Sequence, residues 1–156
     1  MAMESTSSEA PGTRQTPASV AIRPPARRPI PVPSRLPIPA ADWHALVSTR
    51  ANTVIVASEN ATMMVLTAVW PTLKKPIHWV EADRLSLPRQ SAGTLIVQGA
   101  DALSASAQQQ LFDWLERDTH ATRILTTTER PLFPLVEAGS FLTPLYFRLN
   151  VLLLVL

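Results

Sequence analysis

The chain has 156 residues, of which 46% are hydrophobic and 17% charged, and this length suits one modest domain with a tail. It contains no cysteine, which excludes disulfides and thiolate metal sites, and its formal net charge of +2 is weak support for a nucleic-acid partner. Residues 1–9 are polar and the only long apolar run covers residues 151–156, so we expect a cytoplasmic protein that does not enter the membrane.

Residues 1–40 form the first predicted unit, a disordered tail rich in proline and arginine. Nine of the 15 prolines fall between Pro11 and Pro39, and five arginines precede residue 40. Proline fixes φ and removes backbone donors, so the composition predicts a semi-rigid polyproline II spacer without helix or sheet. We favour a solvated linker. The alternative is a ligand for a proline-binding groove, whose arginines also contact acidic surfaces.

Regular structure is predicted from residue 41 onward. Asp42 is placed to cap a short helix over residues 43–49, and the β-branched run at 53–57 is typical of a buried strand. A helix follows over 63–70 and ends at the next proline, and a second strand is expected at 76–80. The first half of this unit therefore alternates between helix and strand.

The same alternation continues to the end of the chain. A third strand is predicted at 93–97, and the helix over 106–116 has Ser104 or Ser106 as its cap. The remaining elements are strands at 122–127 and 151–156 and helices at 131–138 and 142–150. Strands and helices at this spacing indicate an α/β domain with a parallel sheet buried on both faces.

Three stretches resemble the AAA+ domain of the sigma-54-dependent transcriptional activators, the bacterial enhancer-binding proteins. Residues 93–103 (GTLIVQGADAL) are similar to the Walker B strand and its following turn, and residues 123–130 (RILTTTER) to the sensor I strand. Residues 141–151 (FLTPLYFRLNV) are similar to the arginine-finger helix and last strand, and residues 53–70 match a Walker A unit by position alone. The resemblance implies a P-loop NTPase-like fold, with five parallel strands between helices, over residues 41–156.

The Walker A position lacks the residues that bind phosphate. Such a loop needs glycines, whose backbone N–H groups wrap the phosphates, and a lysine to meet their charge. Alignment with the motif places Ala57 and Thr62 at the glycine positions, and Met63 and Met64 at the lysine and hydroxyl positions. Glu59 adds a negative charge. We therefore expect no phosphate cradle, but a capped helix start with both methionines near the core.

The Walker B and sensor I positions also depart from the family pattern. The resemblance places Gln98 and Gly99 where a magnesium-binding aspartate and a catalytic glutamate stand. Glu129 follows the threonine pair where an asparagine is common, which puts a negative charge near a γ-phosphate. Asp101 lies three positions late and is expected to cap the next helix. We predict no catalytic residue, no metal and no cofactor.

The arginine-finger helix keeps one of the two arginines of the family. Leu142 stands at the first position and Arg148 at the second. A lone Arg148 is expected to form a structural ion pair or a helix-end contact, with contact to a neighbouring subunit's nucleotide as the alternative. The interval between Met63 and Gln98 is too short for the GAFTGA loop that grips sigma-54. The chain ends before the family's helical lid and helix-turn-helix.

Together these features predict a degenerate, non-catalytic AAA+-like module that acts in transcription regulation by protein contact. The expected partner is an intact AAA+ activator or another protein, reached through the Arg148 helix and the exposed edge of the last strand. No direct DNA binding is expected. Two alternatives remain: a weakly ATP-binding or ATP-hydrolysing regulator domain, and a structural adaptor that works through its proline-rich tail.

Overall fold

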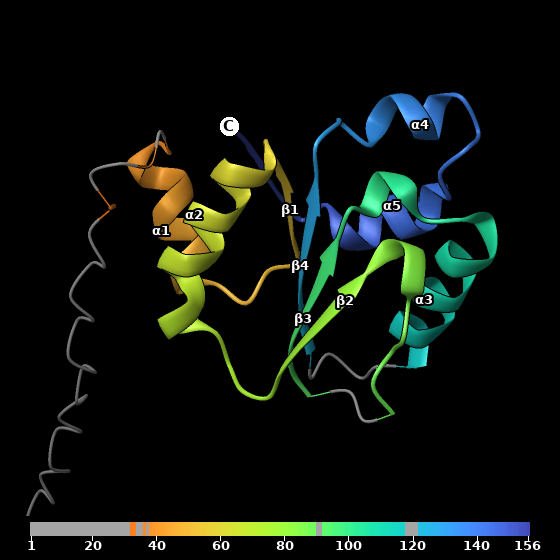
Figure 1. The fold of residues 1–156 in the computed structure, drawn as a ribbon, viewed down its shortest axis with the longest axis horizontal. Coiled ribbons are helices and arrows are strands. Elements are labelled where there is room, and N and C mark those ends of the chain that lie inside the picture. The colour runs from red at the N-terminus through yellow and green to blue at the C-terminus, as the bar shows by residue number, and fades with distance from the viewer. Residues whose placement is uncertain (1–31, 34–35, 37, 90–91, 118–121) are drawn as a thin grey trace, which may run out of the picture.

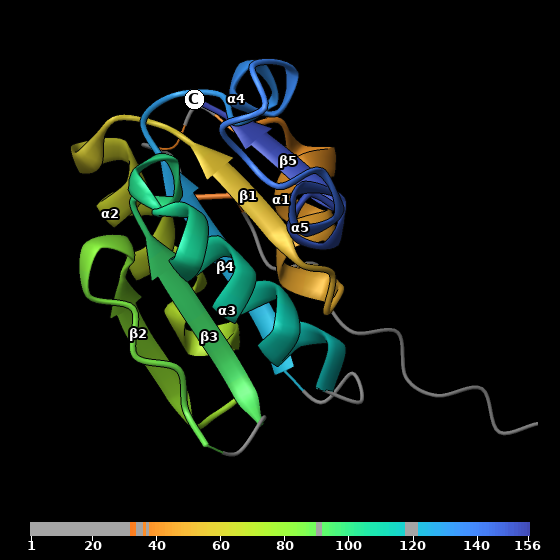
Figure 2. The same cartoon turned by 90° about the vertical axis from the view of Figure 1, so that its right-hand side faces the viewer.

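The computed structural model describes residues 32–33, 36, 38–89, 92–117 and 122–156, and its centre is one parallel sheet (Figure 1). The strands are β1 (Thr53–Val56), β2 (Ile77–Glu81), β3 (Gly93–Gln98), β4 (Thr122–Thr128) and β5 (Leu152–Val155). Their order is β2-β3-β4-β1-β5, and each neighbouring pair is parallel (Figure 2). The predicted parallel five-stranded fold is therefore confirmed. The predicted disorder of residues 1–31 lies outside the described residues.

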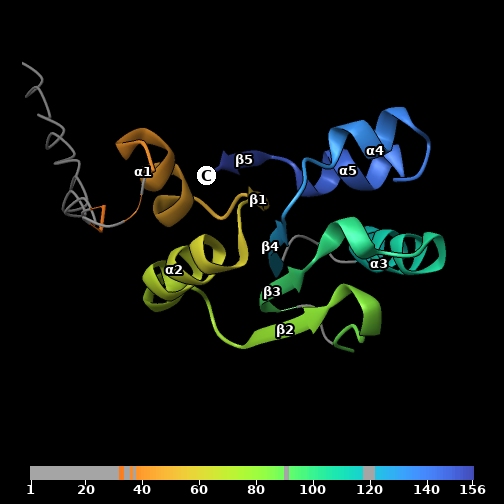
Figure 3. The ribbon, with the colours of Figure 1, turned by 45° about the horizontal axis from the view of Figure 1, so that its top comes forward.

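Helices cover both faces of the sheet. They are α1 (Ala40–Ser48), α2 (Glu59–Val69), α3 (Ala105–Arg117), α4 (Phe133–Glu137) and α5 (Thr143–Leu149), with short 3₁₀ turns at Trp70–Thr72, Ala82–Arg84 and Ala100–Ala102. Helices α1 and α2 lie on one side, and α3, α4 and α5 lie on the other (Figure 3). Within the described ranges, no helix combines the length and apolar character that crossing a bilayer requires.

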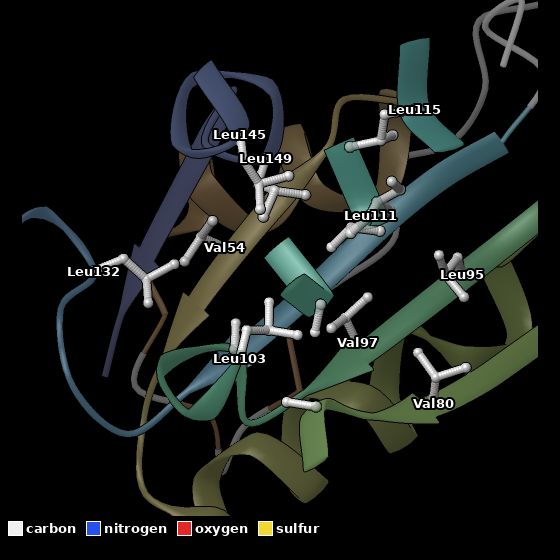
Figure 4. Packing of buried hydrophobic residues seen from close by; sticks show 14 of the residues in the cluster. Val54, Val80, Leu95, Val97, Leu103, Leu111, Leu115, Leu132, Leu145 and Leu149 are labelled. Carbon is white, nitrogen blue, oxygen red and sulfur yellow. The ribbon is translucent and has the colours of Figure 1, made fainter. Parts of the chain in front are cut away.

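The sheet separates two hydrophobic clusters because side chains alternate along each strand. In β1, Val54 and Val56 point toward α3 and α5, whereas Ile55 points toward α1 and α2. Figure 4 shows the first cluster, in which Leu111 of α3 and Leu149 of α5 pack onto the sheet. Every residue of β1 is buried, as expected for a central parallel strand covered on both faces.

Two helix starts differ by three or more residues from the sequence-based prediction. Helix α1 begins at Ala40, so Asp42 lies in its first turn and Pro39 occupies the cap position. Helix α2 begins at Glu59, four residues earlier than predicted. The expectation that Met63 and Met64 lie near the core is wrong, because they are 46% and 42% exposed on the face of α2 that points away from the sheet.

The packed part of the chain begins before the predicted boundary at residue 40. Leu36 and Ile38 are buried in the cluster under α1 and α2, and Val32 packs against its margin. The backbone N–H of Leu36 donates to the carbonyl of Pro33 at 2.9 Å, and the side chains of Leu36 and Ile38 pack in the cluster with residues of α1 and α2. The predicted tail therefore contributes its last residues to the domain.

Candidate functional site

A cavity of about 350 Å³ opens at the carboxyl ends of β1, β3 and β4, beside the first turns of α2. This size lies within the range of about 300–1,000 Å³ for small-molecule sites, and parallel sheets bind ligands at this edge. Its lining residues come from three segments of the chain: Ala57, Glu59, Thr62, Met63, then Gln98, Gly99, Asp101, and finally Thr127, Thr128, Glu129.

The cavity brings together six of the seven positions that the resemblance assigned to nucleotide binding. These are Ala57, Thr62, Met63, Gln98, Gly99 and Glu129. The seventh, Met64, lies on the outer face of α2 and lines an adjoining groove with Pro33 and Leu36. The parallel topology explains the assembly, because the ends of strands that are far apart in sequence meet at one edge.

The strand-to-helix connection at the start of the cavity is short. Only Ala57 and Ser58 separate the end of β1 from the start of α2. The backbone N–H of Thr62 donates to the carbonyl of Ser58 at 2.9 Å, as a helical hydrogen bond. Residues 53–70 therefore form a strand, a two-residue connection and a helix, which is the layout suggested for them by position, with the helix starting earlier than predicted.

A side chain of its own chain caps the N-terminus of α2. The Ser58 hydroxyl accepts a hydrogen bond from the backbone N–H of Ala61 at 3.4 Å, and Glu59 stands in the first turn. A helix N-terminus carries a partial positive charge, which a carboxylate in the first turn offsets. The sequence correctly indicated a capped start here, although it placed the start too late.

Acidic side chains dominate the charge of the cavity. Glu59, Asp101 and Glu129 line it, and none of its lining residues in the described part of the chain is lysine or arginine. Arg130 stands nearby, and its Nε lies 3.0 Å from Oδ2 of Asp101. The expectation that Asp101 caps the next helix is wrong. Ser104 does so, with its hydroxyl accepting from the backbone N–H of Ala107 at 3.2 Å.

Gln98 and Gly99 form the floor between β3 and the following turn. The Oε1 atom of Gln98 accepts a hydrogen bond of 3.0 Å from Nε1 of Trp79. Gly99 has φ of 73° and ψ of 42°, a left-handed conformation that favours glycine. Among the described residues, no group of three histidine, cysteine, aspartate or glutamate side chains is arranged to hold a metal ion.

Thr127 and Thr128 are the part of the site that the sequence reasoning did not assign to it. Thr127 and Thr128 are each 3% exposed and Thr62 is 7% exposed, and all three line the cavity. The Thr128 hydroxyl donates to the carbonyl of Arg130 at 2.7 Å. In the sequence, the only signal for these two residues was that they form the threonine pair in the stretch that resembles sensor I.

Arg148 lies apart from the cavity, at the C-terminal end of α5. Its Nε donates to Oε1 of Glu116 on α3 at 3.0 Å, and its second guanidinium contact is to the same oxygen. The Arg148 carbonyl accepts a hydrogen bond of 2.9 Å from the side-chain amide of Asn52. The expected ion pair is therefore present, and it joins the two helices on one face of the sheet.

Solved structures of the same fold include a domain of a sigma-54 activator. NtrX from Brucella abortus in complex with ATP matches with a TM-score of 0.58 and 16% identity, over 73% of this chain and 34% of that chain. The P-loop NTPase domain of the Sigma-54 transport activator from E. coli matches with a TM-score of 0.52 and 12% identity, over 73% and 93%. A RuvB variant from Thermotoga maritima has a TM-score of 0.52 and 14% identity, over 74% and 43%.

These likenesses establish the fold, and the family follows from the sequence itself. This chain spans about a third of the length of NtrX. No curated protein matches it. The model of the sigma-54 interaction domain matches residues 56–156, which is well over half of the chain and includes the whole cavity lining. The chain therefore belongs to the sigma-54 interaction domain family.

Proposed function

We propose that this chain is a non-catalytic member of its family, which takes part in sigma-54-dependent regulation by contact with another protein. The charge of the cavity carries the proposal: it is lined by Glu59, Asp101 and Glu129 and by no basic side chain of the described residues. Unit charges 4 Å apart repel by about 1 kcal/mol in water and by about 4 kcal/mol near a protein surface. A triphosphate would meet this repulsion, offset only by the N-terminal dipole of α2 and by Arg130, which already pairs with Asp101.

The neutral groups of the cavity support the same proposal. Phosphoryl transfer depends on metal ions and positive side chains that neutralise developing charge. The Gln98 side chain is neutral and already accepts a hydrogen bond from Trp79, so its oxygen is engaged. The backbone N–H of Thr62 is engaged within α2. The position of the Walker B aspartate therefore offers no carboxylate for magnesium, and the Thr62 amide is not free for a phosphate.

An exposed apolar surface supports the protein-contact part of the proposal. Five of the nine exposed large hydrophobic side chains in the described residues belong to α4, α5, β5 and the turn before β5; we call these five the apolar surface: Phe133, Phe147, Val151, Leu153 and Val155. Along β5, Leu154 is buried on the α1 side, while its neighbours Leu153 and Val155 are 47% and 65% exposed on the other side. Apolar patches of this kind mark interaction sites.

The edge of the sheet lies beside this surface. Strand β5 is the last in the order and pairs with β1 alone among the described strands. An edge strand presents backbone N–H and C=O groups that another strand can meet. We therefore propose that an intact AAA+ activator docks against β5 and α5, near Arg148, and that this contact is the regulatory event.

The experiment compares the full chain with two double variants. F147D/L153D places two charges in the apolar surface, and the control M64D/W70D places two charges at other exposed apolar positions. Each protein captures partners from extract of its own cell, and captured proteins are identified by mass spectrometry. We expect the wild type and the control to retain an AAA+ protein and F147D/L153D to lose it.

The same proteins are assayed for release of phosphate from ATP with and without magnesium. We expect none from any of the three. Magnesium-dependent release by the wild type, abolished with no loss of folding by a charge change in the cavity, would favour the weak-ATPase alternative and contradict the proposal. Capture that depends only on residues 1–31 would favour the adaptor alternative.

A further inference from the structure

We propose that β5 of one copy of this chain pairs antiparallel with β5 of a second copy, and that this pairing covers the edge on which the activator docks. The two parallel sheets then join into one continuous sheet. The dimer itself does not depend on the proposed function. Its competition with the activator rests on that function, because both use the same strand edge.

The two edges of the sheet differ in their protection against strand pairing. Native edge strands often carry charged side chains or proline, which discourage pairing with another chain. At the β2 edge, Lys75 and Pro76 precede the strand and Glu81 ends it. At the β5 edge, residues 151–156 read Val-Leu-Leu-Leu-Val-Leu, without charge or proline. Of the two edges that the described strands form, β5 is therefore the one open to a further strand.

The backbone of β5 directs two residues away from β1. The N–H groups of Leu152 and Leu156 donate to carbonyls of the β1 segment, at 3.0 and 2.9 Å. Backbone groups of successive residues alternate in direction along a strand, so the N–H and C=O groups of Leu153 and Val155 point away from β1. Strand β5 has no other neighbour among the described strands. These outward groups are therefore the ones that another strand can meet.

A two-fold axis at Leu154 makes this edge self-complementary. Residues 152–156 are symmetric about Leu154, so Leu153 of one copy stands opposite Val155 of the other. Opposite residues of an antiparallel pair whose N–H and C=O groups face each other exchange two hydrogen bonds. The two-fold axis repeats this pair, so both outward residues of each copy are satisfied.

Pairing also covers apolar side chains that are exposed in the single chain. Leu153 and Val155 are 47% and 65% exposed, and they share a face of the sheet with their β1 partners Val54 and Val56. Residues opposite each other in an antiparallel pair have side chains on the same face, where they contact each other. Leu153 of one copy therefore packs against the partner's Val155, and both lose contact with water.

Charges beside β5 match across the two-fold axis. Arg50 lies two residues before Asn52, whose carbonyl accepts from Leu152 at the start of β5. Asp42 stands in the first turn of α1, which begins at the end of the sheet where β5 ends (Figures 1 and 2). Antiparallel pairing places the start of one β5 beside the end of the other, so Arg50 faces the partner's Asp42. This charge complementarity favours a second copy as the occupant of the edge.

Helix α1 crosses the sheet rather than following β5. It contacts β5, whereas the carbonyl of Leu46 near its end accepts a hydrogen bond of 2.6 Å from Arg123 on β4. In the strand order, β4 lies beyond β1 from β5. The end of α1 is therefore turned away from the edge. In the antiparallel pair, the start of each α1 lies beside the end of the partner's α1, so the two helices occupy different places.

The dimer and the activator compete for one edge. A paired β5 has no outward N–H or C=O group left for another strand. The concentration of the chain then sets the balance: single copies dock on the activator, and paired copies do not. This competition gives the module a form of regulation that needs no nucleotide.

The first test measures the dimer by sedimentation of the full chain over a range of concentrations. L153K places on the edge the kind of charge that protects native edges, and M64K places the same charge on α2, at a position 42% exposed. We expect L153K to raise the dimer dissociation constant at least about tenfold and M64K to leave it unchanged. A wild type that stays monomeric up to about 1 mM, or equal effects of both variants, would overturn the inference.

The second test exchanges the two charges. D42R and R50D each place like charges opposite one another across the axis, and each is expected to weaken the dimer about tenfold. The double variant D42R/R50D restores opposite charges and is expected to return to the wild-type dissociation constant. Additive weakening in the double variant would refute this arrangement of the two copies.

The third test uses the absence of cysteine from the chain, so that any disulfide must join two copies. Non-hydrogen-bonded opposite residues have Cα atoms about 4.5 Å apart, within the span of a disulfide. L154C is therefore expected to form a disulfide dimer under mild oxidation, and M64C is not. If L154C does not fold, a mixture of L152C and L156C takes its place, since these positions are opposite in the same register. Equal crosslinking of the control, or none at the β5 positions, would overturn the register.

Capture from cell extract separates this inference from the proposed function. We expect oxidised L154C to lose the AAA+ protein and the reduced form to retain it. A wild type that captures the AAA+ protein but forms no dimer refutes this inference alone. A dimer whose reduced, single copies capture no AAA+ protein refutes the proposed function alone. Equal capture by the oxidised and reduced forms overturns the competition.

Discussion

The indole Nε1 of Trp79 on β2 donates a hydrogen bond of 3.0 Å to Oε1 of Gln98 at the end of β3. Gln98 stands where the family resemblance places a magnesium-binding aspartate. Its amide oxygen therefore joins two neighbouring strands, and its side chain is held at the cavity floor. This hydrogen bond gives Gln98 a structural role, which a magnesium ion bound at the same position would disturb.

Substitution of Gln98 tests that task. Q98L removes the acceptor and is expected to lower the free energy of unfolding by about 0.5–1 kcal/mol, because the partly exposed indole regains water. Q98D keeps an acceptor and is expected to stay near the wild type. Urea denaturation measures both. Tight magnesium-dependent ATP binding by Q98D would contradict the proposal that nucleotide binding is lost. The wild-type cavity would then lack only the magnesium-binding aspartate.

The glycine after this position predicts a backbone effect. Gly99 has φ of 73°, and a Cβ added there meets no atom within 4 Å, so G99A costs only the left-handed backbone conformation. That conformation costs an L-residue about 1–2 kcal/mol. Gly139, with φ of 71° and equally open surroundings, is the matched control. We expect G99A and G139A to lower stability by similar amounts in urea denaturation. An unchanged free energy of unfolding in G99A would refute the explanation that the left-handed conformation favours glycine at this position.

A buried arginine on β4 predicts a larger effect. Arg123 is 5% exposed, and its guanidinium donates to the carbonyl of Leu46 at 2.6 Å and to that of Ala51 at 3.2 Å. Burial lowers the pKa of Arg123, and the like charge of Arg50 adds to this. R123M leaves both carbonyls unpaired and is expected to cost about 2–4 kcal/mol in urea denaturation.

The same arginine has a pH dependence that can be stated. Because the pKa of Arg123 is lower in the folded state, the unfolded chain binds this proton more readily. The contribution of Arg123 to the free energy of unfolding therefore rises with pH only where the pH approaches the pKa of arginine. Arginine keeps its proton at all ordinary pH values. We therefore expect the difference between R123M and the wild type to stay constant from about pH 6 to 9. A difference that changes in this window would point to another group.

The ion pair between Arg148 and Glu116 is expected to contribute little to stability. Both side chains are about half exposed, at 46% and 47%, and exposed pairs contribute about 0–1 kcal/mol. A double-mutant cycle with R148A and E116A is expected to give a coupling energy below about 1 kcal/mol, which falls further at high salt. A salt-independent coupling of several kcal/mol would show that the pair is effectively buried.

Much of the fold could be predicted because buried parallel strands leave a strong sequence pattern. The β-branched run at residues 53–57 and the run at 93–97 predicted β1 and β3 to within one residue. Helix starts were less predictable. Glu59 and Asn60 are not strong helix signals, and the resemblance suggested a loop at that point, so the start of α2 was placed four residues late.

The positions of the site residues could be predicted from the sequence, whereas their side-chain contacts were harder to predict. The resemblance named six residues that line the cavity, because parallel topology brings strand ends together. The contact of Asp101 with Arg130 was not predicted, because the two residues are 29 positions apart and the resemblance gives neither of them a side-chain partner. The burial of Leu36 was also missed, because its proline-rich surroundings indicated only a solvated tail.

The central claim is that the cavity does not accept a nucleoside triphosphate. Equilibrium binding of labelled ATP to the full chain, measured with and without magnesium, tests it most directly. We predict no saturable binding tighter than about 1 mM in either condition. A micromolar dissociation constant that requires magnesium would contradict the account.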